Sequence, residues 1–462
     1  MPISDADSIA YISSFPAKIF YEGLNKIDLN QNLDVVLLSN TEILLLISSI
    51  LKSDNFGSQL NFATLLFFLI INFKDHKNFS LIVFSSPLII YFISAQKLQL
   101  FFGILFLLSF ILIHKNLIKK KVELFILLLL LTFYSSGKLS YILLTIPLFL
   151  YFFYLNFKDW KKIFTYLLIA FLVIYLPLLI IKQNYFGNII APFFDNFFGQ
   201  NLETYNALTY AMRNTMGWIS NPSDFSQYLR PFISLDLHQL SSSLGLVFLI
   251  MLVNFKLLKK TKYLPIMLII LILITGQILP RYYFEAFLLL AYFFKPEKLI
   301  TKLFIYSQVS VIFLISLIYI YFAYIKYDVI NNKEKYMNKF SYSYYNSNQH
   351  KKDNPIGNIL DFGLDRHSIF FTENIYSQRY LSVLNNFQDN KNKVQNLNKF
   401  ISNNSIKYLI AYPGYKLPKC LKTQMIKETY RVVAVRNFLV DPRKSKFHIL
   451  EIKENNCNNV EK

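Results

Sequence analysis

Long runs of apolar residues separated by short polar connections fill the first two thirds of the chain. A helix that crosses a bilayer needs about 20 apolar residues, or somewhat fewer when aromatic or lysine residues anchor its ends. The runs of suitable length, two of them short, are 57–73, 79–95, 98–114, 121–137, 139–156, 163–182, 243–257, 263–279, 281–294 and 303–325. The pattern predicts an α-helical polytopic membrane protein with about ten spans and additional interfacial helices.

The lysines between these runs predict how the spans are oriented. The connections that are rich in lysine are 114–121, 158–162, 256–262 and 295–302. The alternate short connections contain a single cationic residue each, namely Lys97, Lys138 or Arg281. Lysine-rich loops stay on the cytoplasmic side, so the lysine-poor connections are predicted to face outward. Two spans separate each rich loop from the next, as this orientation requires.

The same parity predicts external positions for the first loop (1–56), the loop 183–242 and the tail after the membrane domain (57–325). Residues 35–51 interrupt an apolar run with the polar sequence Asn-Thr-Glu, which ends at Glu42. A carboxylate at the centre of a span costs about 2.5–3.5 kcal/mol on insertion scales. We therefore interpret this run as an interfacial helix on the outer face.

The polar tail is predicted to contain a linker (326–366) and a small extracytoplasmic α/β domain (367–462). Short apolar stretches predict strands at 368–371, 406–412, 431–435 and 446–452. The segments with helical character are 372–384, 391–403 and 417–428. Strands that alternate with helices indicate an α/β domain. No glycine-rich phosphate loop and no metal-ligand spacing is present in its sequence.

Composition supports a membrane protein and narrows the classes of function. The chain is 54% hydrophobic and only 16% charged, its net charge is +20, and lysines of its apolar part lie between the apolar runs. Membrane lipid is therefore the expected partner, and nucleic acid is not. Two cysteines, Cys420 and Cys457, allow at most one disulfide and define no metal site. The sequence shows no Walker motif, few charges within spans and no internal repeat, which argues against ATP-driven or ion-coupled transport.

Acidic residues near the start of the chain are candidates for catalysis. Asp5 and Asp7 fit the start of a helix over 7–22, where acidic side chains stabilise the helix N-terminus. They also fit a carboxylate above the bilayer that accepts a proton from an acceptor or binds a metal ion. For Glu42 the two interpretations are a side chain that reaches water and a residue that supports a site.

Cationic residues in the outward connections are candidates for phosphate binding. Lys97 is interpreted as an interfacial anchor or as a cation for a lipid-linked phosphate. Arg281, followed by Tyr282, opens a span after Pro280, and arginine is well shaped to bind phosphate with two hydrogen bonds. Glu285, one helical turn later, is the alternative partner for this arginine.

The order of these features resembles the C-type polytopic glycosyltransferases that use lipid-phosphate-linked sugars. This family includes the protein mannosyltransferases and the aminoarabinose transferase of lipid A. The stretch DADSIAYISSFPAKIFYEG (5–23) is similar to the pattern D-x-x-x-Y-H-x-x-x-P-x-x-x-x-x-x-G of bacterial relatives, with Ile12 in the place of histidine. An arginine that opens a late outer-face span, and a small external C-terminal module, also resemble the family.

The resemblance implies a glycosyltransferase of the inner (plasma) membrane that moves a sugar from a polyprenyl-phosphate donor to a glycan, lipid or protein acceptor. The residues it implies are Asp7 or Asp5 as catalytic acid, Lys97, Arg281 and Tyr282 at the donor phosphate, and Glu42 in support. No cofactor is implied beyond the lipid-linked donor, although a divalent metal ion is compatible with the acids. The family has a span before its catalytic acid, so we expect that a first transmembrane helix is missing here.

Two other functions remain open on the sequence. A polymerase or ligase of surface polysaccharide also has ten or more spans and a large outer loop, and its chemistry would depend on Arg213 and Arg230 within 183–242. A flippase or transporter for lipid-linked sugars predicts a polar cavity that crosses the bilayer. A catalyst instead predicts a cavity that is closed below the outer leaflet.

Overall fold

The structure is a computed structural model in which the chain forms two compact units. The residues that it describes are 16, 19–20, 23, 38–51, 53, 55–72, 77–190, 229, 231–233, 243–253, 263–274, 279–340, 357–362, 375–377, 391–432 and 444–455. We call the described residues between 38 and 322 the helical unit. The sheet unit contains the described residues from 323 onward and those before residue 37.

The helices of the helical unit follow the apolar runs of the sequence. They are α2 (Asn40–Ile50), α3 (Phe56–Asn72), α4 (Lys77–Phe84), α5 (Pro87–Ser94), α6 (Gln99–His114), α7 (Lys121–Ser136), α8 (Leu139–Leu155), η4 (Phe157–Asp159), α9 (Trp160–Phe186), α13 (Leu246–Val253), α14 (Tyr263–Ile274), η7 (Pro280–Tyr282), α15 (Phe284–Phe293) and α16 (Leu299–Ile320). The predicted span 79–95 differs, because it is divided into α4 and α5.

Two helices of the described chain are long and apolar enough to cross a membrane. They extend over Phe157–Asn184 and Leu299–Lys326 when their short flanking turns are included. A third such span results if α5 and α6, which are bent by 115° at their junction, are counted together. The other described helices are shorter than a straight span requires. The structure therefore supports a mostly helical protein that is compatible with a membrane, and ten spans stay a prediction.

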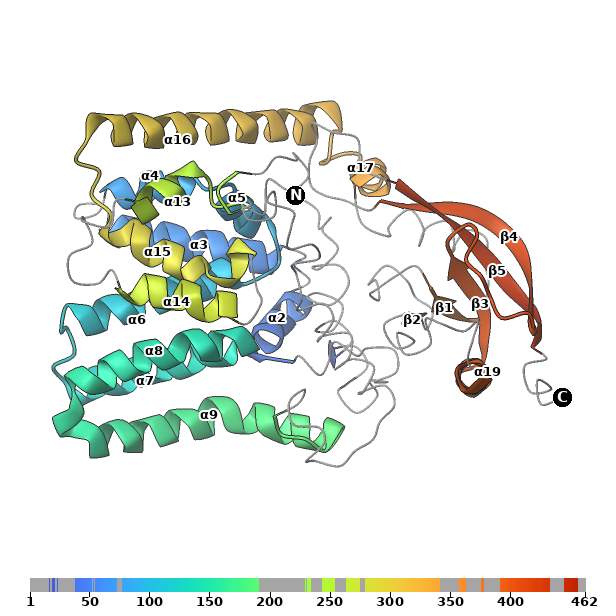
Figure 1. Cartoon of the computed structure of the whole chain (residues 1–462), viewed down its shortest axis with the longest axis horizontal. Coiled ribbons are helices and arrows are strands. Elements are labelled where there is room, and N and C mark those ends of the chain that lie inside the picture. The colour runs from blue at the N-terminus through green and yellow to red at the C-terminus, as the bar shows by residue number, and fades with distance from the viewer. Residues whose placement is uncertain are drawn as a thin grey trace. The chain divides into compact units, whose positions relative to one another are not determined.

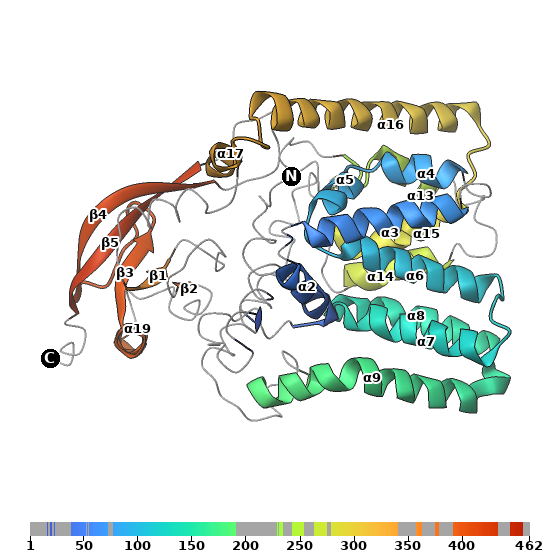
Figure 2. The same cartoon turned by 180° about the vertical axis from the view of Figure 1, so that it is seen from behind.

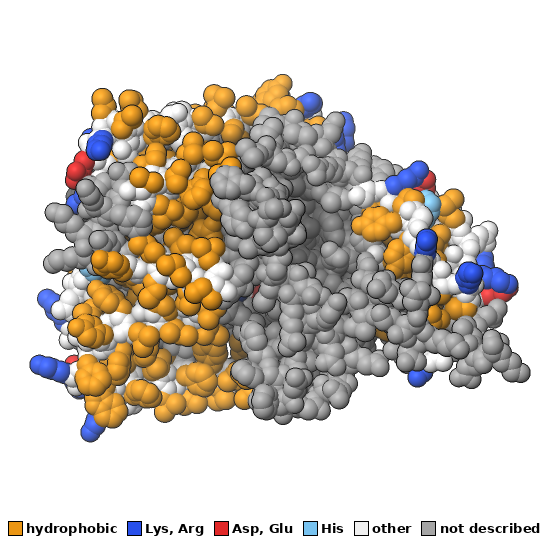
Figure 3. All heavy atoms as spheres, viewed as in Figure 1, with side chains coloured by type: hydrophobic (Ala, Val, Ile, Leu, Met, Phe, Trp, Pro, Cys, Tyr) orange, Lys and Arg blue, Asp and Glu red, His pale blue; other side chains and the backbone are white. Residues whose placement is uncertain are grey.

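Apolar surface decides which helices lie inside the helical unit. The helices α6 and α15 are apolar on all sides and are almost completely buried. By contrast, α9 and α16 lie at opposite edges of the unit (Figures 1 and 2) and expose large apolar side chains such as Val173 and Phe313, each 62% exposed. Figure 3 shows hydrophobic side chains over much of the described face. Uncovered apolar helices of this kind suit a lipid environment.

The break between α4 and α5 is stabilised by a glutamine from α16. Pro87 lacks an N–H, and the residue before a proline avoids helical geometry, so the helix stops at Ser85 and Ser86. The Gln308 amide donates to the carbonyl of Ser85, and its oxygen accepts from the N–H of Val247. These bonds satisfy backbone groups that would otherwise be costly to bury.

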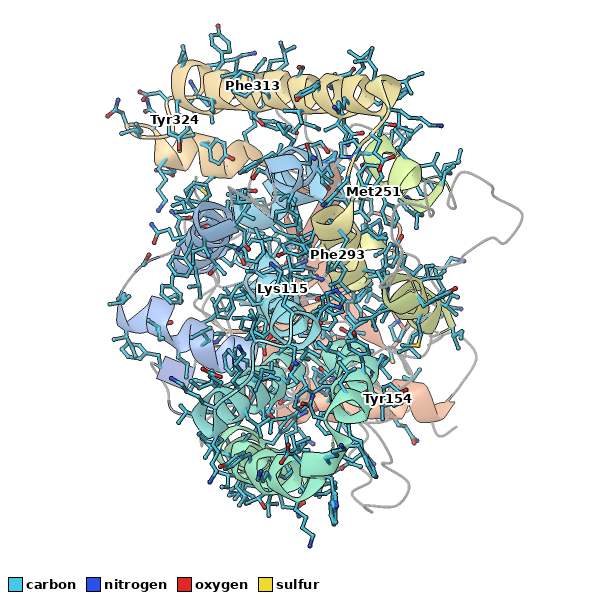
Figure 4. All side chains as sticks on the ribbon, turned by 90° about the vertical axis from the view of Figure 1, so that its left-hand side faces the viewer. Lys115, Tyr154, Met251, Phe293, Phe313 and Tyr324 are labelled. Atoms are coloured by element: carbon cyan, nitrogen blue, oxygen red, sulfur yellow. The ribbon has the colours of Figure 1, made fainter. Side chains whose placement is uncertain are left out.

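The connections between helices gather at two ends of the helical unit. Figures 1 and 2 show the connections 115–120, 156–159 and 294–298 at one end, which we call the lysine-rich end. The turns 95–98 and 137–138, together with η7, lie at the opposite end, which we call the turn end. Figure 4 looks onto the lysine-rich end and shows Lys115 and Phe293 near its centre, with Tyr154 and Phe313 further out.

The sheet unit contains a small mixed sheet. Its elements are η8 (Tyr321–Lys326), which begins in the helical unit, α17 (Lys333–Phe340), β1 (Asn358–Asp361), β2 (Ile375–Ser377), α19 (Lys391–Asn403), β3 (Ile406–Ala411), β4 (Leu421–Val432) and β5 (Lys444–Asn455). The strand order is β2-β1-β3-β5-β4, with β1 parallel to β2 and β3, and β5 antiparallel to β3 and β4. The buried residues Ile359, Ile410, Phe447 and Ile449 form its core.

The strands and helices predicted for the tail are correct in part. The predicted helix 391–403 is α19, and the predicted strands 406–412 and 446–452 correspond to β3 and β5. The helix predicted over 417–428 is wrong, because these residues enter β4, whose pairing with β5 overrides their polar local pattern. The helix predicted at 372–384 is also wrong, because residues 375–377 of this range form the strand β2.

The structure describes only some of the residues for which the remaining predictions in the tail and the first loop were made. The range 326–366, predicted as a linker, contains α17 and β1, whereas the predicted strand 368–371 lies outside the described residues. In the predicted helix 7–22, the described residues Pro16, Ile19 and Phe20 are helical. Gly23, with φ of 79°, donates its N–H to the carbonyl of Ile19 and ends this helix.

Candidate functional site

Two cationic side chains from separate connections lie at the ring of Tyr282 at the turn end, and the charge of a third cation acts on the same residue. The ammonium of Lys138 is 4.4 Å from the centre of the Tyr282 ring, and the guanidinium carbon of Arg281 is 5.2 Å from it. Arg281 Nη2 also lies 3.5 Å from the Tyr282 hydroxyl. The charge of Lys97 acts on both Tyr282 and Lys138. We call Lys97, Lys138 and Arg281 the cation cluster.

Each member of the cation cluster comes just before the start of a helix. Lys97 precedes α6, Lys138 is the residue before α8, and Arg281 lies in η7, directly ahead of α15. The first turn of a helix has unpaired N–H groups and a positive partial charge. Three helix starts and three cations therefore direct positive potential to one place. This arrangement is suited to bind an anion such as a phosphate group.

Asn61 of α3 fixes the turn that carries Lys97. Its fully buried amide donates to the carbonyls of Phe92 and Lys97 at 2.9 and 2.6 Å, and its oxygen accepts from the N–H of Phe101 at 2.9 Å. Lys97 is itself only 8% exposed, and its ammonium is 5.5 Å from the centre of the Tyr91 ring. An interfacial anchor would extend into water. The burial of Lys97 argues against the anchor interpretation.

Gly57 lets α3 approach the same turn closely. Its N–H donates to the side-chain oxygen of Gln96 at 2.8 Å. A Cβ atom at this position would lie 2.4 Å from the Gln96 carbonyl oxygen, which is closer than real contacts allow. The short distance between α3 and the turn therefore requires glycine.

The start of α2 holds the turn that carries Lys138. The Ser39 hydroxyl donates to the carbonyl of Gly137 at 2.7 Å, and the Thr41 hydroxyl donates to the same oxygen. The Asn40 amide donates to the Ser136 hydroxyl at 2.7 Å. The N-cap residue Ser39 and the first two residues of α2 thus fix the backbone next to Lys138.

Glu42 forms a capping box with Ser39 at the start of α2. Its carboxylate accepts the N–H of Ser39 at 2.9 Å and also contacts the Ser39 hydroxyl. Burial raises the pKa of Glu42, although the hydrogen bonds from Ser39 and the charge of Lys138 act in the opposite direction. Glu42 therefore orders the start of α2, which contacts the turn of Lys138.

Arg281 and Glu285 do not form the ion pair that their sequence spacing offers. The structure records no such pair within the described residues, and the fully buried Glu285 interacts with Tyr134 and the charge of Lys138. The backbone of Arg281 is held instead by the side chain of Gln99, which donates to its carbonyl. This bond links the start of α6 to η7.

The cation cluster changes the ionisation of its own members. Burial alone raises the pKa of the Tyr282 phenol, but the charges of Lys138, Arg281 and Lys97 lower it to about 8. Burial lowers the pKa of the Lys138 ammonium, and the positive charge of Arg281 adds to this effect. The site therefore concentrates positive charge enough to shift the protonation of its neighbours.

The structure thus brings together three of the predicted site residues, Lys97, Arg281 and Tyr282, and links Glu42 to them through Lys138. The sequence identified Lys138 only as a mark of orientation. Its position directly before the start of a helix, which it shares with Lys97, was the sequence feature that could have identified it as a candidate site residue. The predicted acids Asp5 and Asp7, and the alternative arginines Arg213 and Arg230, lie outside the described residues. Within the described part, no group of three His, Cys, Asp or Glu side chains could hold a metal ion.

Comparisons with protein-family models, with curated proteins and with solved structures found no match to this chain. The resemblance to lipid-linked glycosyltransferases therefore stays a prediction.

Proposed function

We propose that the protein is a membrane glycosyltransferase that moves a sugar from a polyprenyl-phosphate donor to a glycan, lipid or protein acceptor. The observation that carries this proposal is the cation cluster, in which Lys138 and Arg281 lie at the Tyr282 ring, the charge of Lys97 acts on Tyr282, and each cation comes just before a helix start. A phosphate joined to an apolar polyprenyl chain matches both the cations and the apolar surface of the helical unit. The resemblance of residues 5–23 supports the same class of enzyme.

We assign the turn end to the outer face of the inner (plasma) membrane. The connections at the other end are rich in lysine, and such loops stay in the cytoplasm. A ten-span arrangement with an extracytoplasmic tail fits this orientation. The disulfide bond of Cys420 in the sheet unit also fits, because disulfides persist outside the cytoplasm. Cys457 is the only other cysteine of the sequence.

The proposed chemistry uses the cation cluster to stabilise the leaving group. Transfer breaks the bond between the sugar and the phosphate oxygen, so polyprenyl monophosphate departs with one more negative charge than the donor phosphate had. Fixed cations stabilise charge that develops in this way. The acceptor hydroxyl forms the new bond to the sugar and loses its proton, which we assign to Asp7 or Asp5.

Phosphate binding tests the proposal most simply. We would measure binding of a polyprenyl monophosphate to the protein in nanodiscs, with the uncharged polyprenol as a reference. Loss of a charged hydrogen bond costs about 1.5–3 kcal/mol, so K97Q, K138Q and R281Q should each weaken binding by about 10- to 150-fold.

Lys115 provides a matched control at the lysine-rich end. Its ammonium also lies above a tyrosine ring, 5.9 Å from the centre of Tyr292. K115Q should change the affinity by less than about twofold, because it removes an exposed charge outside the site. Equal losses in K115Q and the three cluster variants would contradict the proposal, as would equal binding of polyprenol and polyprenyl monophosphate.

The catalytic acid is tested by product formation. D5N and D7N should retain phosphate binding, and at least one of them should lose glycan product by about 100-fold or more. Full product formation by both variants would contradict the catalytic assignment of Asp5 and Asp7. It would not contradict the proposed phosphate site.

A lipid-linked-sugar flippase is the second candidate, and the bend between α5 and α6 favours it. The two helices meet at 115°, and interrupted helices whose N-termini approach an anionic substrate are common in transporters. An assay of the purified protein in vesicles distinguishes a flippase from a glycosyltransferase. A flippase moves the labelled donor across the bilayer without an acceptor, whereas a glycosyltransferase consumes the donor only when an acceptor is present.

A further inference from the structure

The sheet unit contains a topological switch point between β1 and β3. These strands are parallel neighbours. The chain leaves β1 for β2 on one side of the pair, and it leaves β3 for β4 and β5 on the other side. In open α/β sheets, ligands bind outside the carboxyl ends of the strands at such a point. The residues that follow Asp361 at the end of β1 and Ala411 at the end of β3 are therefore candidates for a second binding site.

A tight turn directly after β3 fixes two tyrosines at this edge of the sheet. The turn covers residues 412–415, and we call it the tyrosine turn. The N–H of Tyr415 donates to the carbonyl of Tyr412 at 3.0 Å. Pro413 and Gly414 occupy its centre, and the φ of 79° at Gly414 fits the third position of a type II turn. Hydrogen bonding and turn chemistry thus place one tyrosine at each end of the turn.

Each of these tyrosines packs on a buried phenylalanine. The Tyr412 ring centre is 4.4 Å from that of Phe447 in β5, and the Tyr415 ring stacks at 4.9 Å on Phe362, the residue after β1. Tyr412 is nevertheless 45% exposed, and Tyr415 is half-buried. Aromatic side chains that are already fixed lose little conformational entropy when a ligand binds to them. The tyrosine turn therefore presents an ordered aromatic surface to solvent.

The size and chemistry of this surface favour a sugar ring as the ligand. The first and last Cα atoms of a turn lie within about 7 Å of each other, which matches about one or two sugar rings. A stable protein partner needs about 800 Å² on each side, more than a turn of four residues provides. Sugar rings have C–H faces that pack on aromatic rings, and hydroxyls that pair with phenols and with cations such as the exposed Lys416.

We propose that the tyrosine turn binds a sugar ring of the acceptor, so that the acceptor of the transfer reaction is a glycan. This inference rests on the proposed function, because only a transfer reaction requires an acceptor. It selects one of the three acceptor classes that the proposed function includes. Sugar binding at the tyrosine turn does not itself depend on the cation cluster, so the two sites can be tested separately.

Saturation-transfer NMR with the full chain in nanodiscs tests the sugar site. The probes are chitotriose, maltotriose and cellotriose, and the ring protons of at least one of them should receive saturation from the protein. Y412L keeps an apolar contact with Phe447 but removes the flat ring, and it should weaken binding of that trisaccharide by about three- to tenfold. Y412F keeps the ring and should lose less affinity than Y412L.

Met425 of β4 provides a matched control in the same unit. It is an apolar side chain that is 56% exposed, and β5 separates its strand from β3. M425A should leave the affinity for the trisaccharide unchanged. Deuterated tyrosine rings provide a test that does not alter the fold. They should reduce transfer to the sugar when aromatic protons are irradiated, whereas deuterated phenylalanine rings should have little effect.

The outcomes separate this inference from the proposed function. Saturation transfer to none of the three sugars overturns the inference, as does transfer that neither Y412L nor tyrosine deuteration reduces. If polyprenyl monophosphate binds and no sugar binds, the inference fails and the proposed function stands. If a sugar binds at the tyrosine turn but the protein does not distinguish polyprenyl monophosphate from polyprenol, the proposed function fails, and the acceptor role fails with it.

Discussion

The two ends of the helical unit both carry cations, but in opposite settings. At the lysine-rich end, residues such as Lys115, Lys158 and Lys295 are exposed and follow the ends of α6, α8 and α15. At the turn end, Lys97 is buried, Lys138 and Arg281 are half-buried, and all three precede the starts of the same helices. One set of helices therefore has cations at both termini.

The helix dipole gives the cations at the two ends opposite energies. A cation after a helix C-terminus is stabilised by the helix dipole by about 0.3–1 kcal/mol, and a cation before the N-terminus is destabilised by a similar amount. Exposed lysines at the favourable end need no ligand. On the proposed function, a phosphate bound between the cations at the other end would offset the unfavourable dipole there.

The largest expected effect comes from the residue that holds the turn of Lys97. N61L removes three hydrogen bonds and leaves the carbonyls of Phe92 and Lys97 and the N–H of Phe101 buried without Asn61. We expect a loss of about 3 kcal/mol in the free energy of unfolding, measured in detergent, together with loss of phosphate binding.

The matched control for this substitution is N72L near the other end of α3. The Asn72 amide donates within its own helix, to the carbonyl of Phe68. Its replacement should change the free energy of unfolding by about 0.5 kcal/mol or less. Similar losses in N61L and N72L would show that the turn end is not specially organised.

An intermediate effect is expected from pH. The pKa of Tyr282 is about 8, so the phenol is neutral below this pH and becomes a phenolate above it. The phenolate repels phosphate and offsets the cations, and the lowered pKa of Lys138 acts in the same direction. Affinity for polyprenyl monophosphate should fall on the order of tenfold between pH 7.5 and 9.5.

The substitution Y282F tests the source of this pH dependence. The fall in affinity should move to higher pH, because the phenol is removed and Lys138 remains. The second ionisation of a phosphate ester, near pH 6, strengthens binding as pH rises and therefore cannot produce the same trend. An identical pH profile in Y282F and the wild type would contradict the assigned role of Tyr282.

The smallest effect is expected at the start of α2. S39A removes the hydroxyl that donates to Gly137 and breaks the capping box with Glu42. The free energy of unfolding should fall by about 1 kcal/mol. S48A is the control, since the Ser48 hydroxyl donates within α2 to Leu45, and it should have little effect. A larger loss in S48A than in S39A would argue against docking of α2 on the turn of Lys138.

The sequence predicted those parts of the site that stand out as polar residues between apolar runs. Lys97 and Arg281 were identified in this way. The similar Lys138 was used only to predict the orientation of the membrane spans. Single lysines in short turns are commonly anchors, and only the fold brings these three connections together. The capping role of Glu42 was readable from Ser39 three residues earlier.

Other features of the fold depend on neighbours that are distant in the sequence. The break between α4 and α5 has a local signal in Ser85, Ser86 and Pro87, but its stabilisation by Gln308 does not. The strand β4 is rich in lysine and polar residues, and its conformation is set by pairing with β5. The bent junction of α5 and α6 likewise depends on Asn61 of α3.

Photo-crosslinking tests the central claim most directly, that the turn end binds a lipid-linked phosphate. A polyprenyl monophosphate with a diazirine next to the phosphate would be crosslinked to the full chain in nanodiscs, and the modified peptides mapped by mass spectrometry. The account predicts crosslinks in 95–98, 137–138 and 279–283, which excess unlabelled polyprenyl monophosphate removes and polyprenol does not. Crosslinks concentrated in 115–121 and 156–162, or unaffected by the phosphate competitor, would contradict it.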